Sequence, residues 1–164
     1  MVRTEALLEA VRPDTVLLAV SEVQSSSGFR VHLEPLAERC RDTGARLFVN
    51  LTQSAGVLRT DAAALGADFV AAHGYKWLLG PRGGRLAGRA PDRLPELEPL
   101  APNWHSVPDA YADYYGDSPL APDASRLTLS WAWFSGVGAQ AALELLARLD
   151  PGEVEALALA QALR

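Results

Sequence analysis

Three short apolar runs, separated by segments with a helical pattern, constrain the fold of this chain more than any other feature. The runs cover residues 15–20, 46–51 and 68–72. Between the first two, residues 33–43 predict a helix that ends at Gly44, and its apolar stripe consists of Leu33, Leu36, Ala37 and Cys40. Residues 60–65 predict a shorter helix. This alternation predicts an α/β fold, with a mostly parallel sheet and flanking helices.

The remaining segments extend this pattern into one predicted α/β domain over residues 1–164. Residues 4–11 predict an N-terminal helix with Thr4 as its N-cap. The run at residues 15–20 is continuously apolar, which predicts a strand covered on both faces. Residues 131–149 predict a long helix, and Pro151 opens a last helix that continues to the end of the sequence. That last helix has an apolar face that needs a partner.

Two stretches whose polar residues suggest chemistry begin within the second and third apolar runs and extend beyond them, at residues 48–56 and 71–84. In a parallel sheet the carboxyl ends of the strands meet at one rim, where ligands bind. Asn50 and Gln53 from the first stretch, and His73 and Lys76 from the second, are therefore expected at the same rim. Ser25, beyond the first run, is expected there too.

Lys76 is the only lysine in the chain, and it is followed by Trp77, Leu78 and Leu79. Apolar surroundings lower the pKa of a lysine because desolvation disfavours the ammonium form. The neutral amine is the nucleophile that Schiff-base chemistry requires. The alternative is that Lys76 extends from a strand-to-loop junction and keeps its amine in water.

Composition excludes several classes of function. The formal charge is −5 and there is no basic cluster, so nothing indicates nucleic-acid binding. One cysteine, Cys40, permits no intrachain disulfide and is expected to be buried in its helix. The three histidines lack the spacing of metal ligands. We expect a cytoplasmic protein, because no signal peptide or membrane-spanning run is apparent.

Three motifs together resemble the class V aminotransferase family, which comprises fold-type I enzymes that use pyridoxal 5'-phosphate (PLP). They are Ser-Ala-Gly at residues 54–56, Leu-Gly-Ala-Asp-Phe at 65–69 and Tyr-Lys-Trp-Leu-Leu-Gly-Pro-Arg-Gly at 75–83. The resemblance runs from about residue 15 to about residue 149, or the central part of the family's large domain. Cysteine desulfurases and kynureninases belong to this family. Ser-Glu-Val-Gln at residues 21–24 and Tyr75 are most similar to the kynureninase-like branch.

The resemblance implies a role for each matched residue. Lys76 would form the internal aldimine with PLP and move the substrate proton. Gln53 would bond the phenolic oxygen of the cofactor, while His73 and Tyr75 would contact its phosphate. Asn50 stands where the family has the aspartate that pairs with the pyridine nitrogen.

Two further matches concern the amino-acid substrate. Ser25 lies where many members have an asparagine near the substrate. Trp104 matches the aromatic residue of the family's Gly-Trp turn, although Asn103 replaces the glycine. Trp104 also lies near several tyrosines in the sequence. Tyrosines grouped in this way are compatible with a pocket or an interface, but we predict a surface loop packed by its own side chains.

The chain departs from the family pattern in three ways. Asn50 is neutral, so the ring nitrogen would lose its proton and carbanion chemistry would slow. Trp131 replaces the threonine that reaches the phosphate across the dimer interface in the family. The resemblance also implies that the family's upstream cofactor-binding helix and its C-terminal small domain are not expected within these residues.

These observations support two hypotheses. The first is a PLP-dependent enzyme that acts on an amino acid by transamination or Cβ elimination and is incomplete without other parts. A homodimer, or a partner chain that supplies those parts, is expected in that case. The second is a non-catalytic remnant or interaction domain with the same fold.

Overall fold

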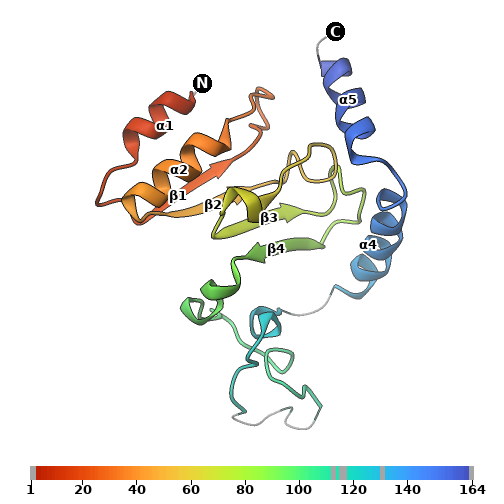
Figure 1. The fold of residues 1–164 in the computed structure, drawn as a ribbon. Coiled ribbons are helices and arrows are strands. Elements are labelled where there is room, and N and C mark those ends of the chain that lie inside the picture. Colours follow the sequence, from red (N-terminus) through yellow and green to blue (C-terminus); the bar gives the residue numbers. More distant parts are fainter. Residues whose placement is uncertain (1–2, 112–113, 115–117, 130–131, 163–164) are drawn as a thin grey trace. The chain divides into compact units, whose positions relative to one another are not determined.

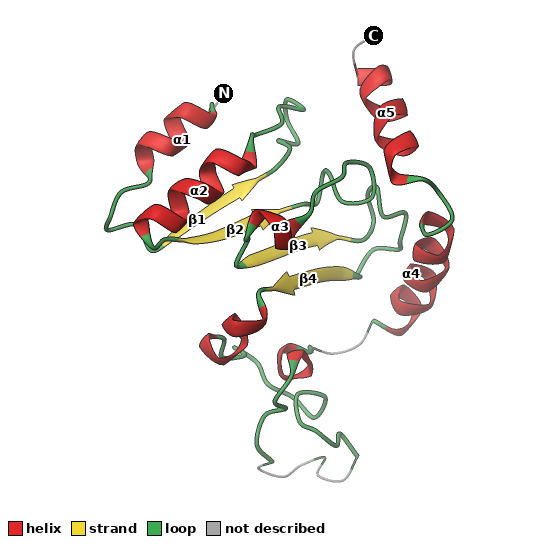
Figure 2. Ribbon diagram, viewed as in Figure 1, coloured by secondary structure: helices red, strands yellow, loops and turns green. Residues whose placement is uncertain are grey.

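The computed structural model describes residues 3–111, 114, 118–129 and 132–162. Figures 1 and 2 show its helices and strands. In chain order these are α1 (Thr4–Ala10), β1 (Leu17–Ser21), α2 (Leu33–Thr43), β2 (Arg46–Asn50), α3 (Ala62–Leu65), β3 (Phe69–His73), β4 (Arg85–Arg89), α4 (Trp133–Leu146) and α5 (Pro151–Ala162). Two short 3-10 helices cover Pro91–Glu96 and Ala124–Leu127.

The described strands form a four-stranded sheet in the order β1-β2-β3-β4. β1 pairs with β2 and β2 with β3 in parallel, while β4 runs antiparallel to β3. The mostly parallel α/β fold is thereby confirmed. β4 was not predicted, because it lacks an apolar run: Leu86 and Ala87 are both exposed, and arginines stand at its two ends.

One face of the sheet, which we call the covered face, packs against α2. Leu18 of β1 lies opposite Leu47 of β2, and Val20 lies opposite Val49. These four residues belong to the main hydrophobic core, together with Val70 of β3. The predicted stripe of α2 is buried in the same core: Leu33, Leu36, Ala37 and Cys40. The periodicity of residues 33–43 therefore predicted the side of the helix that faces the sheet.

We call the opposite face of the sheet the open face. Among the described residues of β1, β2 and β3 whose side chains lie on this face, none is fully buried. Leu17 of β1, paired with Arg46, is 49% exposed, and Ala19 is exposed as well. Phe48 and Asn50 of β2 are half-buried. The prediction that residues 15–20 are covered on both faces is wrong, because no described helix buries this side of β1.

Most of the predicted helix boundaries are close to the observed ones, with two corrections. Gly44 ends α2 in the left-handed conformation, as predicted. Thr4 is the first residue of α1 rather than its N-cap, which is Arg3. α4 begins at Trp133 and ends at Leu146, inside the predicted bounds of 131–149. Trp131 itself lies outside the described residues.

The chain divides into two compact units. The first comprises Met1–Ala90 and Phe134–Arg164, and the second comprises Pro91–Trp133. In the second, the Trp104 ring packs against His105, Tyr111 and Tyr114, with ring centroids 3.7, 5.6 and 4.8 Å apart. This confirms a loop packed by its own aromatic side chains.

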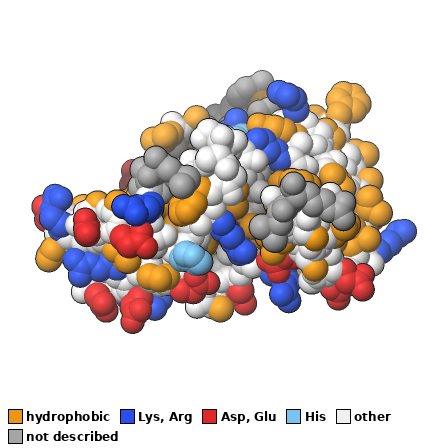
Figure 3. All heavy atoms as spheres, turned by 90° about the horizontal axis from the view of Figure 1, so that it is seen from above, with side chains coloured by type: hydrophobic (Ala, Val, Ile, Leu, Met, Phe, Trp, Pro, Cys, Tyr) orange, Lys and Arg blue, Asp and Glu red, His pale blue; other side chains and the backbone are white. Residues whose placement is uncertain are grey.

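Apolar side chains of α4 and α5 reach the surface, as the space-filling view in Figure 3 shows for one face of the molecule. Phe134 is 93% and Val137 74% exposed. Across the described part of the chain, no helix combines the length and apolar character needed to cross a membrane.

Candidate active site

The second strand ends at Asn50, and a tight turn follows it. The backbone N–H of Thr52 donates a 2.9 Å hydrogen bond to Asn50 Oδ1. The turn continues through Gln53, which is half-buried, and Ser54, which is fully buried. This bond fixes the Asn50 amide with Oδ1 toward the turn, so its Nδ2 donor is at the other end of the amide.

The third strand ends at His73, directly beside this turn. The His73 N–H donates a 3.2 Å hydrogen bond to Thr52 Oγ1. Asn50 pairs with Ala71 in the parallel register, so Asn50 and His73 belong to the same open face of the sheet. The expected meeting of Asn50 and His73 at one rim is therefore observed.

Beyond His73, three side chains with hydrogen-bond donors gather at the end of β3. The rings of His73 and Tyr75 have centroids 5.2 Å apart. The Arg82 guanidinium carbon lies 5.1 Å above the Tyr75 ring, within the range of a cation–π interaction. An imidazole, a phenol and a guanidinium together form a donor set that suits a phosphate group.

The two polar motifs touch through Gly56. Gly56 has a positive φ of 95°, and a Cβ at this position would lie 2.7 Å from the Trp77 carbonyl oxygen. Only glycine combines this backbone conformation with so close an approach. The turn that carries Gln53 is therefore packed against the residue that follows Lys76.

Lys76 is half-buried in a compact loop. Its carbonyl accepts a hydrogen bond from the N–H of Leu79, and Gly80 donates to the Gly74 carbonyl. Of the three apolar residues that follow it, Leu78 is buried, whereas Trp77 and Leu79 are 49% and 56% exposed. The half-buried position of Lys76 lies between the two alternatives that the sequence offered, and both stay predictions.

Helix α4 anchors the far end of this loop. Ser135, which is buried, donates a 2.6 Å hydrogen bond from Oγ to the carbonyl of Arg82. A Cβ on Gly138 would collide with the ring of Pro81. The close packing of α4 on residues 81–82 holds the end of the loop from which Lys76 projects.

Ser25 and Gln53 line a common cavity of about 770 Å³. Trp77 and the apolar side of α5, including Val154 and Leu157, also line it. The cavity lies within the first unit. Trp104, the other predicted substrate residue, belongs to the second unit.

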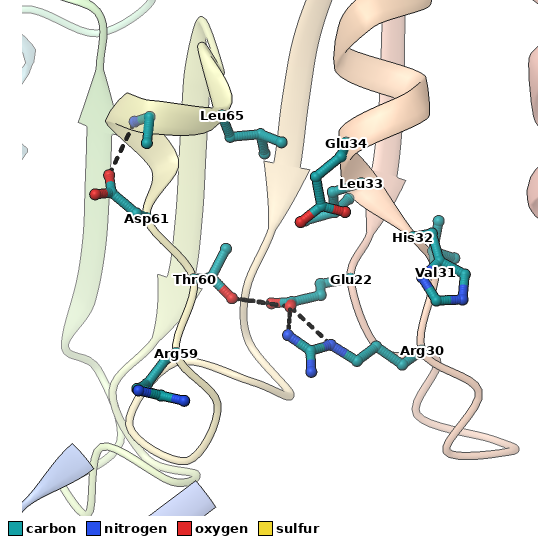
Figure 4. Close-up of a pocket in the computed structure, with 11 residues that line it drawn as sticks. Glu22, Arg30, Val31, His32, Leu33, Glu34, Arg59, Thr60, Asp61 and Leu65 are labelled. Atoms are coloured by element: carbon teal, nitrogen blue, oxygen red, sulfur yellow. Dashed lines mark hydrogen bonds and ion pairs between the residues drawn. The ribbon is translucent and has the colours of Figure 1, made fainter. Parts of the chain in front are cut away.

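A buried carboxylate near this cavity was missed by the sequence analysis. Glu22, directly after β1, is only 1% exposed and bonds Arg30 and Thr60 in a second cavity of about 410 Å³ (Figure 4). Its partners are 8 and 38 positions away along the chain. The only local indication in the sequence was a glutamate at a strand end, Glu22, with an arginine eight positions later, Arg30.

Comparison with known proteins identifies the family. The model of aminotransferase class V matches residues 1–162. The chain belongs to the class V aminotransferase family. The chain is 31% identical to isopenicillin N epimerase of Streptomyces clavuligerus over 163 residues, 93% of this chain and 40% of the relative. It is 35% identical to a probable cysteine desulfurase of Methanothermobacter thermautotrophicus over 133 residues, 80% of this chain and 33% of the relative.

Solved structures agree with this class V assignment. The apo cysteine desulfurase from Thermococcus onnurineus NA1 aligns with a TM-score of 0.79 at 24% identity, over 93% of this chain and 37% of that protein. The cystine C-S lyase C-DES, in complex with its product cysteine persulfide, aligns with a TM-score of 0.78 at 28% identity, over 92% and 40%. The chain thus spans about 40% of the length of such class V relatives.

PLP is confirmed as the cofactor of this class V fold, since a C-DES variant has been solved with glycine covalently linked to PLP. The residues present here fit the group. A lysine amine suits the aldehyde, and the donors of His73, Tyr75 and Arg82 suit the phosphate. The kynureninase-like affinity stays a prediction, because the relatives named here are an epimerase, desulfurases and a lyase.

Proposed function

We propose that the chain forms the PLP-binding part of a class V enzyme that acts on an amino acid. One observation carries this proposal: Asn50, His73 and the loop of Lys76 meet at one rim of a parallel sheet, with Gly56 packed on Trp77. These are the residues that the family motifs matched, and they come from two segments that the fold brings together.

Each residue has a proposed task in holding the cofactor. Lys76 would hold the cofactor through its amine, which suits the aldehyde. Gln53 would bond the phenolic oxygen, and His73 and Tyr75 would bond the phosphate. Asn50 would offer its Nδ2 donor to the pyridine nitrogen. When bound, PLP supplies the electron-withdrawing ring that activates the α-carbon of an amino acid for transamination or Cβ elimination.

Lys76 is also the residue proposed to move the substrate proton, because its amine is the only lysine amine in the chain. Ser25 and Trp104 are proposed substrate contacts, of which Ser25 opens into the same cavity as Gln53. The cytoplasm is the proposed location.

A second copy or a partner chain is proposed to complete the site. The chain spans about 40% of the length of its relatives, and on α4 Phe134 is 93% and Val137 74% exposed. Large exposed apolar side chains of this kind mark interaction surfaces.

The second candidate is a non-catalytic interaction domain of the same fold, and Asn50 favours it. An amide at this position offers a hydrogen-bond donor where a carboxylate would hold a protonated pyridine nitrogen, so the ring withdraws electrons less strongly. Binding of PLP and turnover of amino acids must therefore be tested separately.

Absorbance spectra of the purified protein titrated with PLP, followed by borohydride reduction and peptide mapping, test the proposal. We expect a visible band and a reduced adduct on Lys76. Lys76→Ala is expected to lose both while keeping its circular dichroism. An adduct on the N-terminal amine alone, or no band at saturating PLP, would refute the cofactor site. A band without turnover would support the interaction domain.

A further inference from the structure

Glu22 has an unusual position for a charged residue, because its side chain is only 2% exposed. Its Oε1 accepts hydrogen bonds from Arg30 Nε at 3.1 Å and Nη2 at 2.9 Å. The Thr60 hydroxyl lies 2.8 Å from both carboxylate oxygens. A charge so buried is stable only when its partners satisfy it, so this site is a built part of the fold.

The backbone of Glu22 connects to the candidate active site as well. Its N–H donates a 3.1 Å hydrogen bond to the carbonyl of Asn50, and its own carbonyl accepts a 2.8 Å bond from Val31. Glu22 therefore contacts the end of β2 through its main chain and two loops through its side chain.

Both loops line the 770 Å³ cavity, together with Trp77 and the apolar side of α5. The first loop runs from Val23 to Arg30 and carries Ser25. Val23 and Arg30 pair in an isolated antiparallel β-bridge at the base of this loop. The second runs from Gln53 to Thr60 and contains Gly56. Figure 4 shows Arg30 and Thr60 reaching Glu22 from opposite sides.

We propose that Glu22 is a positioning residue that holds the Ser25 loop and the Gln53 loop at a fixed separation across the cavity. The expected effect on PLP affinity rests on the proposed function. The link between the two loops rests only on the hydrogen bonds and the ion pair of Glu22. Arg30 holds the carboxylate from the Ser25 side and Thr60 from the Gln53 side. Glu155 of α5 also joins these loops, because it lies 3.7 Å from Arg30 and 2.8 Å from Arg59. Loss of either Glu22 contact therefore loosens the link at the base of the loops and leaves the Glu155 link in place.

Thr60→Val is the sharpest test, because it removes one hydroxyl and leaves the Arg30 ion pair intact. Hydrogen exchange is measured on the protein without PLP. We expect the backbone N–H groups of Gly28, Val57 and Leu58, all hydrogen-bonded within the two loops, to exchange roughly tenfold faster. Glu34→Gln is the matched control, because Glu34 is exposed and lines the same 410 Å³ cavity. It is expected to change neither loop.

The PLP dissociation constant, measured well below the melting temperature, gives a readout that a purely structural role would not move. Thr60→Val is expected to raise it roughly tenfold, and Thr60→Ser, which keeps the hydroxyl, is expected to restore it. Unchanged exchange in both loops, or equal acceleration in β1 and β2, would overturn the proposal. If the wild-type protein binds no PLP, the proposed function fails, and the exchange experiment still decides the role of Glu22.

Discussion

The two faces of the sheet differ sharply in how they are buried. On the covered face, Leu47 and Val49 are almost completely buried against α2. On the open face, Leu17 is half exposed, and Phe48 is only half-buried. Both faces belong to the same three parallel strands, so the difference comes from what packs on them and not from the strands themselves.

The comparison assigns different roles to the two faces: the covered face stabilises the fold, and the open face carries the candidate site. The covered face is closed by helices encoded between the strands, as βαβ units require. The open face carries Asn50 and His73 at its rim. We infer that the covered face supplies most of the stability of the first unit, while the open face is available to a ligand or partner.

A matched pair of leucine substitutions tests this inference with the largest expected effect. Leu36→Ala removes a fully buried side chain beneath the covered face and is expected to lower the free energy of unfolding by about 2–5 kcal/mol. Leu17→Ala, on the open face, is expected to change it by about 0.5 kcal/mol or less. Urea unfolding of both variants measures the difference. Equal losses would show that the open face is packed as tightly as the covered one.

The second prediction concerns Asn50. In Asn50→Asp, a carboxylate oxygen can still accept the Thr52 N–H, while the other oxygen faces the pyridine nitrogen as a charged partner. We expect PLP affinity, and any turnover of amino acids, to rise by roughly tenfold, the value of one charge-assisted hydrogen bond. PLP titration and amino-acid assays measure these changes.

Asn50→Ala serves as the control, because it loses both the turn and the donor. It is expected to bind PLP more weakly than the wild type. If Asn50→Asp binds PLP no better than the wild type, Asn50 does not face the pyridine nitrogen, and the match of this position to the family aspartate is wrong.

The sequence predicted the covered face better than the open one, for a physical reason. The stripe of α2 follows from the 3.6-residue period, and the order of β1, α2, β2 and β3 follows from local composition. β4 has no apolar run, because it is specified by its pairing with β3. The Glu22–Thr60 contact joins residues 38 positions apart, and no local pattern reveals such a contact.

The candidate site was likewise predicted only in part from the sequence. The motifs located the rim residues, since the carboxyl ends of parallel strands must meet. The exposure of Trp77 beside Lys76 was not predicted, because sequence neighbours need not pack on one another in a loop. Tertiary contacts decide such burial, and they are not encoded in the spacing.

The third prediction addresses the exposed face of α4. Phe134→Ser combined with Val137→Ser is expected to change the free energy of unfolding by about 0.5 kcal/mol or less, because both side chains are already in solvent. If this face is the proposed interface with a second copy, sedimentation will show the variant dissociating at concentrations at which the wild type is dimeric. If the wild type sediments as a monomer, self-association is contradicted. The site would then need a separate partner chain to complete it.

The smallest effect is expected from pH, through Glu155 on α5. The hydrogen bond from Arg59, 2.8 Å long, lowers the pKa of the Glu155 carboxyl below its usual value. A carboxylate with a lowered pKa in the folded state stabilises that state above the unfolded pKa, near 4.3. This contribution is lost as the pH falls through the folded pKa. Hydrogen exchange of α5 is therefore expected to accelerate, relative to β2, as the pH falls below the unfolded pKa near 4.3. Glu155→Gln should remove that dependence, whereas Glu153→Gln, two residues away, should keep it. If Glu155→Gln retains the pH dependence, another group holds α5 in place.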